Sequence, residues 1–136
     1  MAPNVTFANY PGAGQETSDT YHYSQSVRIG QVIKVSGQGG WNADGELAKG
    51  DIKKQVQYAF DNLDRAIKEA GGKGLTDVYS VRSWHVNMEE SFPLVVEQFK
   101  KTMPDHRPLW TCVGVTTLAL PGMEIEIDVE AYVDSK

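Results

Sequence analysis

The feature that most constrains the fold is the alternation of polar and apolar residues from Glu124 to Val133. Successive side chains of a β-strand point to opposite faces, so this pattern predicts one strand with an apolar face and a polar face. The apolar face comprises Ile125, Ile127, Val129, Ala131 and Val133, and the polar face comprises Glu124, Glu126, Asp128, Glu130 and Tyr132. Because carboxylates at every second position repel one another, either water screens them all or some have partners across an interface.

The last third of the chain holds a second strand, and two amphipathic helices precede it. The second strand is expected from Arg107 to Val115, before the turn that leads into the alternating strand. Asp51 is a good N-cap for a helix that ends at Gly71 and Gly72. Another helix is predicted from about Ser91 to Met103, where Pro104 stops it.

The remaining segments predict further β-structure. Strands are expected at Val5–Ala8, Val32–Gln38 and Asp77–Val86, with an edge strand possible over Tyr21–Arg28 and a loop over Pro11–Thr20. The glycines of Ser36–Gly40 are not compatible with regular strand, and they predict a bulge or a close approach of another backbone or a ligand. The order of elements indicates an α+β fold, in which one mixed, mostly antiparallel sheet is covered on one face by two helices.

Length and composition restrict the class of protein. The 136 residues are enough for one domain, expected to span residues 1–136, and no apolar run approaches a membrane span. No secretory signal is recognisable, and one cysteine excludes an internal disulfide framework. A cytoplasmic location is therefore expected, with an organelle as the alternative. Eighteen acidic against thirteen basic residues, without a basic patch, argue against nucleic-acid binding.

Three kinds of chemistry are open to the polar residues. The three histidines stand at no metal-ligand spacing, so no metal site is expected. Cys112 is either a nucleophile or a small buried hydrophobic residue. Asp128, nearest the middle of the acidic face, is either a general base that orients a water molecule or a surface charge. The residues alone favour the structural alternative for both side chains.

An ordered set of motifs resembles the RidA (YjgF) family. These motifs are Tyr23–Val27, Val32–Gln38, the helix from Asp51 to Ala70 with its Gly-Gly end, Thr111–Val115, Leu120-Pro121 and Ile125–Ala131. They cover nearly the whole chain from Tyr21 to Val133. No single motif is decisive, and the order of the set carries the resemblance.

The resemblance implies a chorismate-mutase-like fold assembled as a homotrimer, with small-molecule clefts between subunits. The best-known activity of the family is hydrolysis of reactive enamines and imines to ammonia and a 2-oxo acid, as in 2-iminobutanoate/2-iminopropanoate deaminases. That chemistry needs neither a metal nor a bound cofactor. A trimer would also give some carboxylates of the acidic strand partners across an interface.

The resemblance also implies roles for individual residues. Tyr23 matches the tyrosine that lines the cleft, and Ser36 and Gly37 match the pair that approaches the ligand. Cys112 matches the cysteine at the cleft floor. Asp128 matches the position of a glutamate thought to hold the hydrolytic water, although its side chain is one methylene shorter. Asp128, Cys112 and Tyr23 are thus the expected catalytic residues.

Trp110 is the main departure from the family pattern, because family deaminases carry an arginine there that clamps the substrate carboxylate. An indole has one donor and no charge, so it does not replace a bidentate guanidinium. Strand parity places Trp110 on the same face as Cys112, where it either stacks on a ligand or fills the core or an interface. The segment Pro11–Thr20 also looks longer than in the family, which would alter the cleft rim.

The sequence therefore predicts a RidA-like small-molecule hydrolase with altered specificity, which processes 2-aminoacrylate poorly. Tyr23, Ser36, Gly37 and Trp110 are its expected ligand-binding residues. The alternative is a non-catalytic metabolite-binding trimer. An RNA-directed endoribonuclease ranks lowest because of the charge balance.

Overall fold

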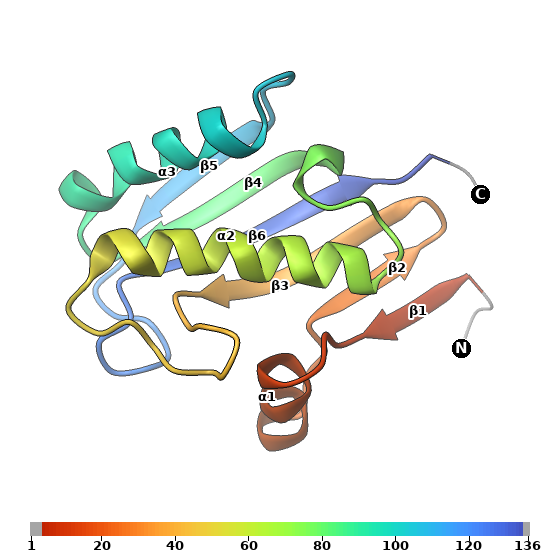
Figure 1. The fold of residues 1–136 in the computed structure, drawn as a ribbon, viewed down its shortest axis with the longest axis horizontal. Helices are drawn as coiled ribbons and strands as arrows, with labels where there is room; N and C mark the ends of the chain where they lie inside the picture. Colours follow the sequence, from red (N-terminus) through yellow and green to blue (C-terminus); the bar gives the residue numbers. More distant parts are fainter. Residues whose placement is uncertain (1–3, 135–136) are drawn as a thin grey trace.

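Strand β6 (Ile125–Tyr132), which contains the alternating segment, lies inside the sheet in a computed structural model that describes residues 4–134. Across these residues six strands form one sheet in the order β1-β2-β3-β6-β4-β5 (Figure 1). The other strands are β1 (Val5–Ala8), β2 (Ser26–Ile29), β3 (Val32–Gly39), β4 (Val78–His85) and β5 (Leu109–Gly114). The helices are α1 (Ala13–Tyr21), α2 (Ile52–Glu69) and α3 (Met88–Thr102), with a 3-10 turn at Leu75–Asp77.

The sheet is mixed and mostly antiparallel, as predicted. Only the β4–β5 pair is parallel among the strand pairs of the described chain. A parallel pair needs a crossover connection, and α3 supplies it between these two strands. Helices α2 and α3 cover the same face of the sheet, while α1 stands apart from them at the lower edge of the view (Figure 1). The predicted α+β fold class is therefore confirmed.

The apolar side of β6 faces the helices. Ile125, Ile127 and Ala131 are completely buried, and Val129 is 3% exposed. They form one hydrophobic core with the apolar stripe of α2, which includes Val56, Ala59, Phe60, Leu63, Ala66 and Ile67. Burying a large aliphatic side chain stabilises the fold by about 2 kcal/mol. This layer confirms the predicted apolar face of the strand.

The polar side of β6 has partners within its own chain. Glu130 accepts a hydrogen bond of 2.6 Å from the Tyr79 hydroxyl and lies 3.8 Å from the Lys34 ammonium. The Asp128 carboxylate pairs with Arg82 on β4 at 2.8 Å. Residues of the adjacent strands therefore pair with two of the carboxylates. These two carboxylates need neither water alone nor a partner subunit to offset their repulsion.

Helix α1 replaces the loop predicted over Pro11–Thr20, and this prediction was wrong. Its composition is typical of a loop, but tertiary contacts hold the helix in place. The Gln25 amide donates to Gly14 O at 3.1 Å and to Thr17 Oγ1 at 2.6 Å. Gly14 lies against the Tyr10 ring so closely that a Cβ would come within 2.8 Å of it. After α1, β2 covers only the last part of the strand suggested for Tyr21–Arg28, and β1 rather than β2 is the edge strand.

The two long helices begin at side-chain caps. Asp51 accepts a hydrogen bond from Lys54 N at 3.0 Å, which confirms the predicted start of α2. Asn87 accepts one from Glu90 N at 3.3 Å. Because Asn87 is a cap, α3 begins at Met88, three residues before the predicted start at Ser91.

Strand β3 carries the predicted bulge. Val35 pairs with Val129 and Gln38 pairs with Ile127, so Ser36 and Gly37 together stand opposite one residue of β6. Farther along, the backbone of Gly40 packs on α2. A Cβ at Gly40 would lie 2.4 Å from the Cα of Gln55. The glycine cluster therefore serves both the bulge and the close approach of a helix backbone.

No helix of the described residues is long and apolar enough to cross a membrane.

We expect Gly40→Ala to lower the free energy of unfolding by about 1–3 kcal/mol, because the added methyl group meets backbone that moves only with α2. The control is Gly114→Ala, where nothing lies within 4 Å of the added Cβ. The control should stay within about 0.5 kcal/mol of the parent protein. Urea unfolding followed by circular dichroism measures both variants, and equal losses would contradict the packing assigned to Gly40.

Candidate active site

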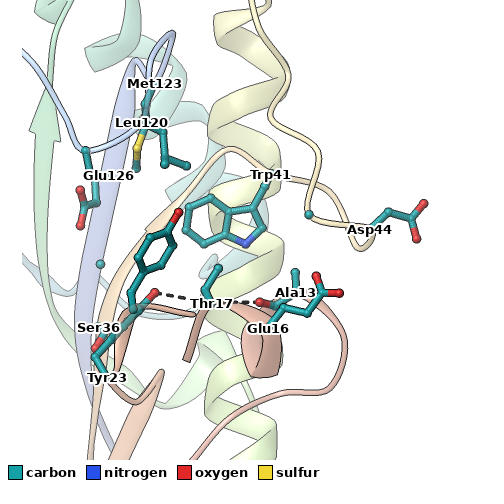
Figure 2. Close-up of a pocket in the computed structure, with 14 residues that line it drawn as sticks. Ala13, Glu16, Thr17, Tyr23, Ser36, Trp41, Asp44, Leu120, Met123 and Glu126 are labelled. Atoms are coloured by element: carbon teal, nitrogen blue, oxygen red, sulfur yellow. Dashed lines mark hydrogen bonds between the residues drawn. The ribbon is translucent and has the colours of Figure 1, made fainter. Parts of the chain in front are cut away.

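A pocket of about 560 Å³ lies where α1, the β3 bulge and the start of β6 meet. Its lining includes Thr17, Tyr23, Ser36, Gly37, Trp41 and Glu126. Leu120 and Met123, from the segment before β6, add an apolar wall. Figure 2 shows the Glu126 carboxylate on one side of the Trp41 indole and Asp44 on the other. Three of the predicted site residues, Tyr23, Ser36 and Gly37, therefore share one cavity.

Glu126 reaches this pocket because Gly37 has no side chain. A Cβ on Gly37 would lie 1.8 Å from Glu126 Oε2, a distance that no real contact allows. The bulge thus leaves a space over its glycine that the carboxylate fills. The glycine cluster predicts a close approach, and at Gly37 the neighbour is the Glu126 side chain from β6.

Glu126 is shifted toward its protonated form. Burial raises the pKa of its carboxyl, and the neighbouring Asp128 carboxylate adds to the increase. Within the described chain no ion pair compensates this carboxylate. A carboxyl group with a raised pKa titrates closer to neutral pH, which suits it to exchange a proton with a reacting group.

A buried chain of polar side chains supports the pocket from below. Trp41 Nε1 donates to the Tyr10 hydroxyl at 3.1 Å, and Tyr10 donates to Gln38 Oε1 at 2.7 Å. The Gln38 amide donates to Gln25 Oε1, also at 2.7 Å. The Gln25 amide then reaches the Tyr23 hydroxyl at 3.2 Å. This chain fixes the positions of Trp41 and Tyr23, and it ties α1 to the sheet.

Asp128 lies outside this pocket. Its Oδ1 accepts from Arg82 Nε at 2.8 Å, and its Oδ2 accepts from Trp84 Nε1 at 3.0 Å. Both partners belong to β4, so the carboxylate turns away from the bulge that stands opposite it. The water-holding role predicted for Asp128 thus falls on a residue outside the pocket, whereas Glu126, two residues earlier, lines it. Alternation along the strand does not distinguish Glu126 from Asp128, because both lie on the same face. The signal that separates them is Gly37, because a glycine in the bulge leaves space for a side chain of the neighbouring strand.

Trp110 and Cys112 lie on another part of the chain. The Trp110 ring stacks on Phe92 with centroids 4.7 Å apart and meets Phe99 edge-on at 5.0 Å. Its Nε1 donates to Ser83 Oγ at 2.8 Å. Cys112 pairs with Ser83 in the parallel ladder and is partly buried. Trp110 therefore packs between α3 and the sheet, as expected if its side chain fills the core. Within one chain, neither Trp110 nor Cys112 lines the pocket that contains Tyr23.

His85 belongs to the structure around Trp110. Ser83 Oγ lies 2.7 Å from its Nε2, and Ser91 Oγ lies 2.6 Å from its Nδ1. Because Ser83 accepts from Trp110 and Ser91 donates to Asn87 O, the neutral ring is satisfied on both sides. Burial lowers the pKa of the imidazole. His85 is thus a buried, hydrogen-bonded structural histidine.

Metal-binding side chains are not grouped in the described part of the chain. Across residues 4–134 no three His, Cys, Asp or Glu residues lie close enough to hold an ion. The pocket residues themselves offer acid–base chemistry by Glu126, with hydroxyl groups and aromatic rings around it.

The six-stranded mixed sheet with α2 and α3 on one face, and the pocket at the bulge of β3, define a class of small α+β proteins. Comparison with known sequences shows to which family of this class the chain belongs. The sequence model of the family described as Endoribonuclease L-PSP matches residues 14–133. The chain therefore belongs to the RidA (YjgF) family.

Individual relatives extend this assignment. RutC family protein YjgH of Escherichia coli K12 is 36% identical over 128 residues, which are 93% of this chain and 94% of the relative. The solved structure of protein YJGH has a TM-score of 0.81 at 32% identity, with 98% of this chain and 99% of that chain covered. A 2-iminobutanoate/2-iminopropanoate deaminase of Dermatophagoides farinae is 34% identical over 71% of this chain and 74% of its own.

We expect Glu126→Gln to raise the free energy of unfolding at neutral pH. Folding raises the pKa of the Glu126 carboxyl, so the ionised carboxylate destabilises the folded state. This destabilisation begins when the pH rises above the pKa in the unfolded chain, and it is complete when the pH exceeds the pKa in the folded protein. The neutral amide removes the cost, so the difference between variant and parent should vanish well below pH 4.5, the ordinary pKa. Urea unfolding at both pH values measures it. A variant less stable than the parent at neutral pH would contradict the assigned desolvation.

Proposed function

We propose that the protein is a small-molecule hydrolase of the enamine and imine deaminase type, and that Glu126 is its acid–base group. The observation that carries the proposal is the Glu126 carboxyl with its raised pKa beside Tyr23, Ser36 and Gly37 in one pocket. Family membership and the name of the Dermatophagoides farinae relative support the reaction class. The role expected for Asp128 passes to Glu126, because the hydrogen bonds from Arg82 and Trp84 occupy both Asp128 oxygens.

The reaction needs one group that takes and returns a proton. The Glu126 carboxylate accepts a proton from water while the water oxygen bonds to the carbon of a protonated imine. The resulting carbinolamine has neutral nitrogen. The protonated Glu126 then gives its proton to that nitrogen. The C–N bond breaks with its electron pair on ammonia, and the Glu126 carboxylate takes the hydroxyl proton and passes it to the departing ammonia. The net change converts one protonated imine and one water molecule into one carbonyl compound and one ammonium ion.

The substrate preference follows from the residue that replaces the family arginine. Trp110 brings no charge, and its ring is held by α3 in the single chain. We therefore propose altered specificity, with poor turnover of 2-aminoacrylate. Binding of a metabolite without turnover is the alternative outcome, and a cytoplasmic location remains a prediction.

We propose a homotrimer, as the family resemblance implies. The exposed apolar side chains on the first strands, Phe7 at 55% and Ile29 at 45%, support a partner on that part of the sheet. Light scattering at micromolar concentration should give three times the 15.0 kDa mass of one chain. A monomeric mass under those conditions would contradict the trimer.

Replacing Glu126 tests the catalytic assignment. Glu126→Gln should lower the rate of imine hydrolysis at least about a hundredfold, because a positioned acid–base group contributes about that much. Asp128→Asn should change it far less, and Glu97→Gln, an exposed carboxylate on α3, is the neutral control. Ammonia release from imines generated by an oxidase measures all three. If Asp128→Asn instead lowers the rate about a hundredfold and Glu126→Gln leaves it unchanged, the catalytic assignment returns to Asp128.

A further inference from the structure

The lining of the Glu126 pocket is acidic and aromatic. Glu16 and Asp44 stand at its exposed rim, and Glu126 lies inside. Tyr21, Tyr23 and Trp41 supply aromatic surface. None of the described residues that line the pocket is lysine, arginine or histidine. The charge of the lining thus matches a cation and repels an anion.

The hydrogen-bond donors of the inner wall are already used within the protein. Ser36 Oγ donates to Ser24 O at 2.7 Å, and Thr17 Oγ1 donates to Ala13 O at 3.1 Å. The Trp41 indole N–H is committed to Tyr10. The Ser36 hydroxyl can still accept a hydrogen bond, because its oxygen keeps its lone pairs. A ligand therefore meets acceptors on this wall and has to bring the donors itself.

The aromatic residues lead to the same conclusion by a separate route. Trp41 is 8% exposed, and its edge nitrogen is fixed below the pocket. What it can present to the cavity is carbon and π surface. The electron-rich face of an indole attracts ammonium and iminium groups, and the attraction grows when water is excluded. Tyr23, fixed through Gln25, adds a second ring.

We infer that this pocket selects small organic nitrogen cations without a carboxylate, namely protonated imines and the corresponding amines. The inference rests on the proposed hydrolase function for turnover, but the binding preference stands on the pocket alone. A 2-imino acid would place its carboxylate near the uncompensated Glu126 without a basic group in the lining. A protonated imine without that group places N–H donors against Ser36 and Glu126 and its charge beside Trp41.

The binding preference is tested with two ring compounds of equal shape. Piperidine is a cation at neutral pH, and tetrahydropyran is its neutral ether analogue. Isothermal titration of the wild-type protein should show piperidinium binding at least about tenfold tighter than tetrahydropyran. Glu126→Gln should remove most of that ratio, and Glu97→Gln should preserve it. Equal affinities for the two probes would overturn the inference.

The substrate class is tested with two imines that differ only in the carboxylate. An amine oxidase makes propan-1-imine from propylamine, and an amino-acid oxidase makes 2-iminobutanoate from 2-aminobutanoate. Hydrolysis of either imine releases ammonia, so the rate of ammonia release above that of a blank without the protein reports turnover. The rate constant should be at least about tenfold larger for propan-1-imine than for 2-iminobutanoate, because the carboxylate of 2-iminobutanoate meets no basic residue in the pocket.

The outcomes separate this inference from the proposed function. Faster hydrolysis of 2-iminobutanoate would keep the hydrolase and overturn the cation preference. Tight binding of piperidinium without turnover of either imine would keep the preference and overturn the hydrolase. Neither binding nor turnover would overturn both.

Discussion

The central constraint on this protein is that β6 lies between β3 and β4 while its two faces meet different surroundings. Its apolar residues complete the core under α2, and this fixes which side chains face the other way. A register slip of one residue would exchange the two faces, so the core determines the register. The positions of Glu126 and Asp128 on the polar face are therefore a consequence of core packing.

The neighbours of β6 then give its two middle carboxylates different roles. On one side, β4 offers Arg82 and the Trp84 indole, and these two donors satisfy Asp128. On the other side, the bulge of β3 offers the space above Gly37, and Glu126 occupies it without a cationic partner. Two chemically similar groups on one face thus have different hydrogen-bond partners because their adjacent strands differ, and burial without a donor raises the pKa of Glu126.

The sequence was sufficient where the pattern is local. The alternation from Glu124 to Val133 predicted the central strand and its buried face, and the Asp51 cap predicted the start of α2. Helix α1 was missed because the amides of Gln25 and the ring of Tyr10, which hold it, are tertiary partners that composition does not reveal. The sequence does not distinguish Glu126 from Asp128 for the same reason, since period two places both on one face and only the neighbouring strands differ. Parity did place Trp110 and Cys112 together, but it did not show that α3 covers that side.

The pocket and its proposed ligand are connected through one carboxylate. Glu126 is desolvated and unpaired, so its charge disfavours the folded state, whereas Asp128 is fully hydrogen-bonded. A side chain chosen for stability alone would be neutral at this position. A cationic ligand removes the imbalance, because it supplies both the opposite charge and the N–H donors that the pocket wall does not offer. The charge that costs stability in the free protein is thus the same feature to which we assign ligand selection and proton transfer.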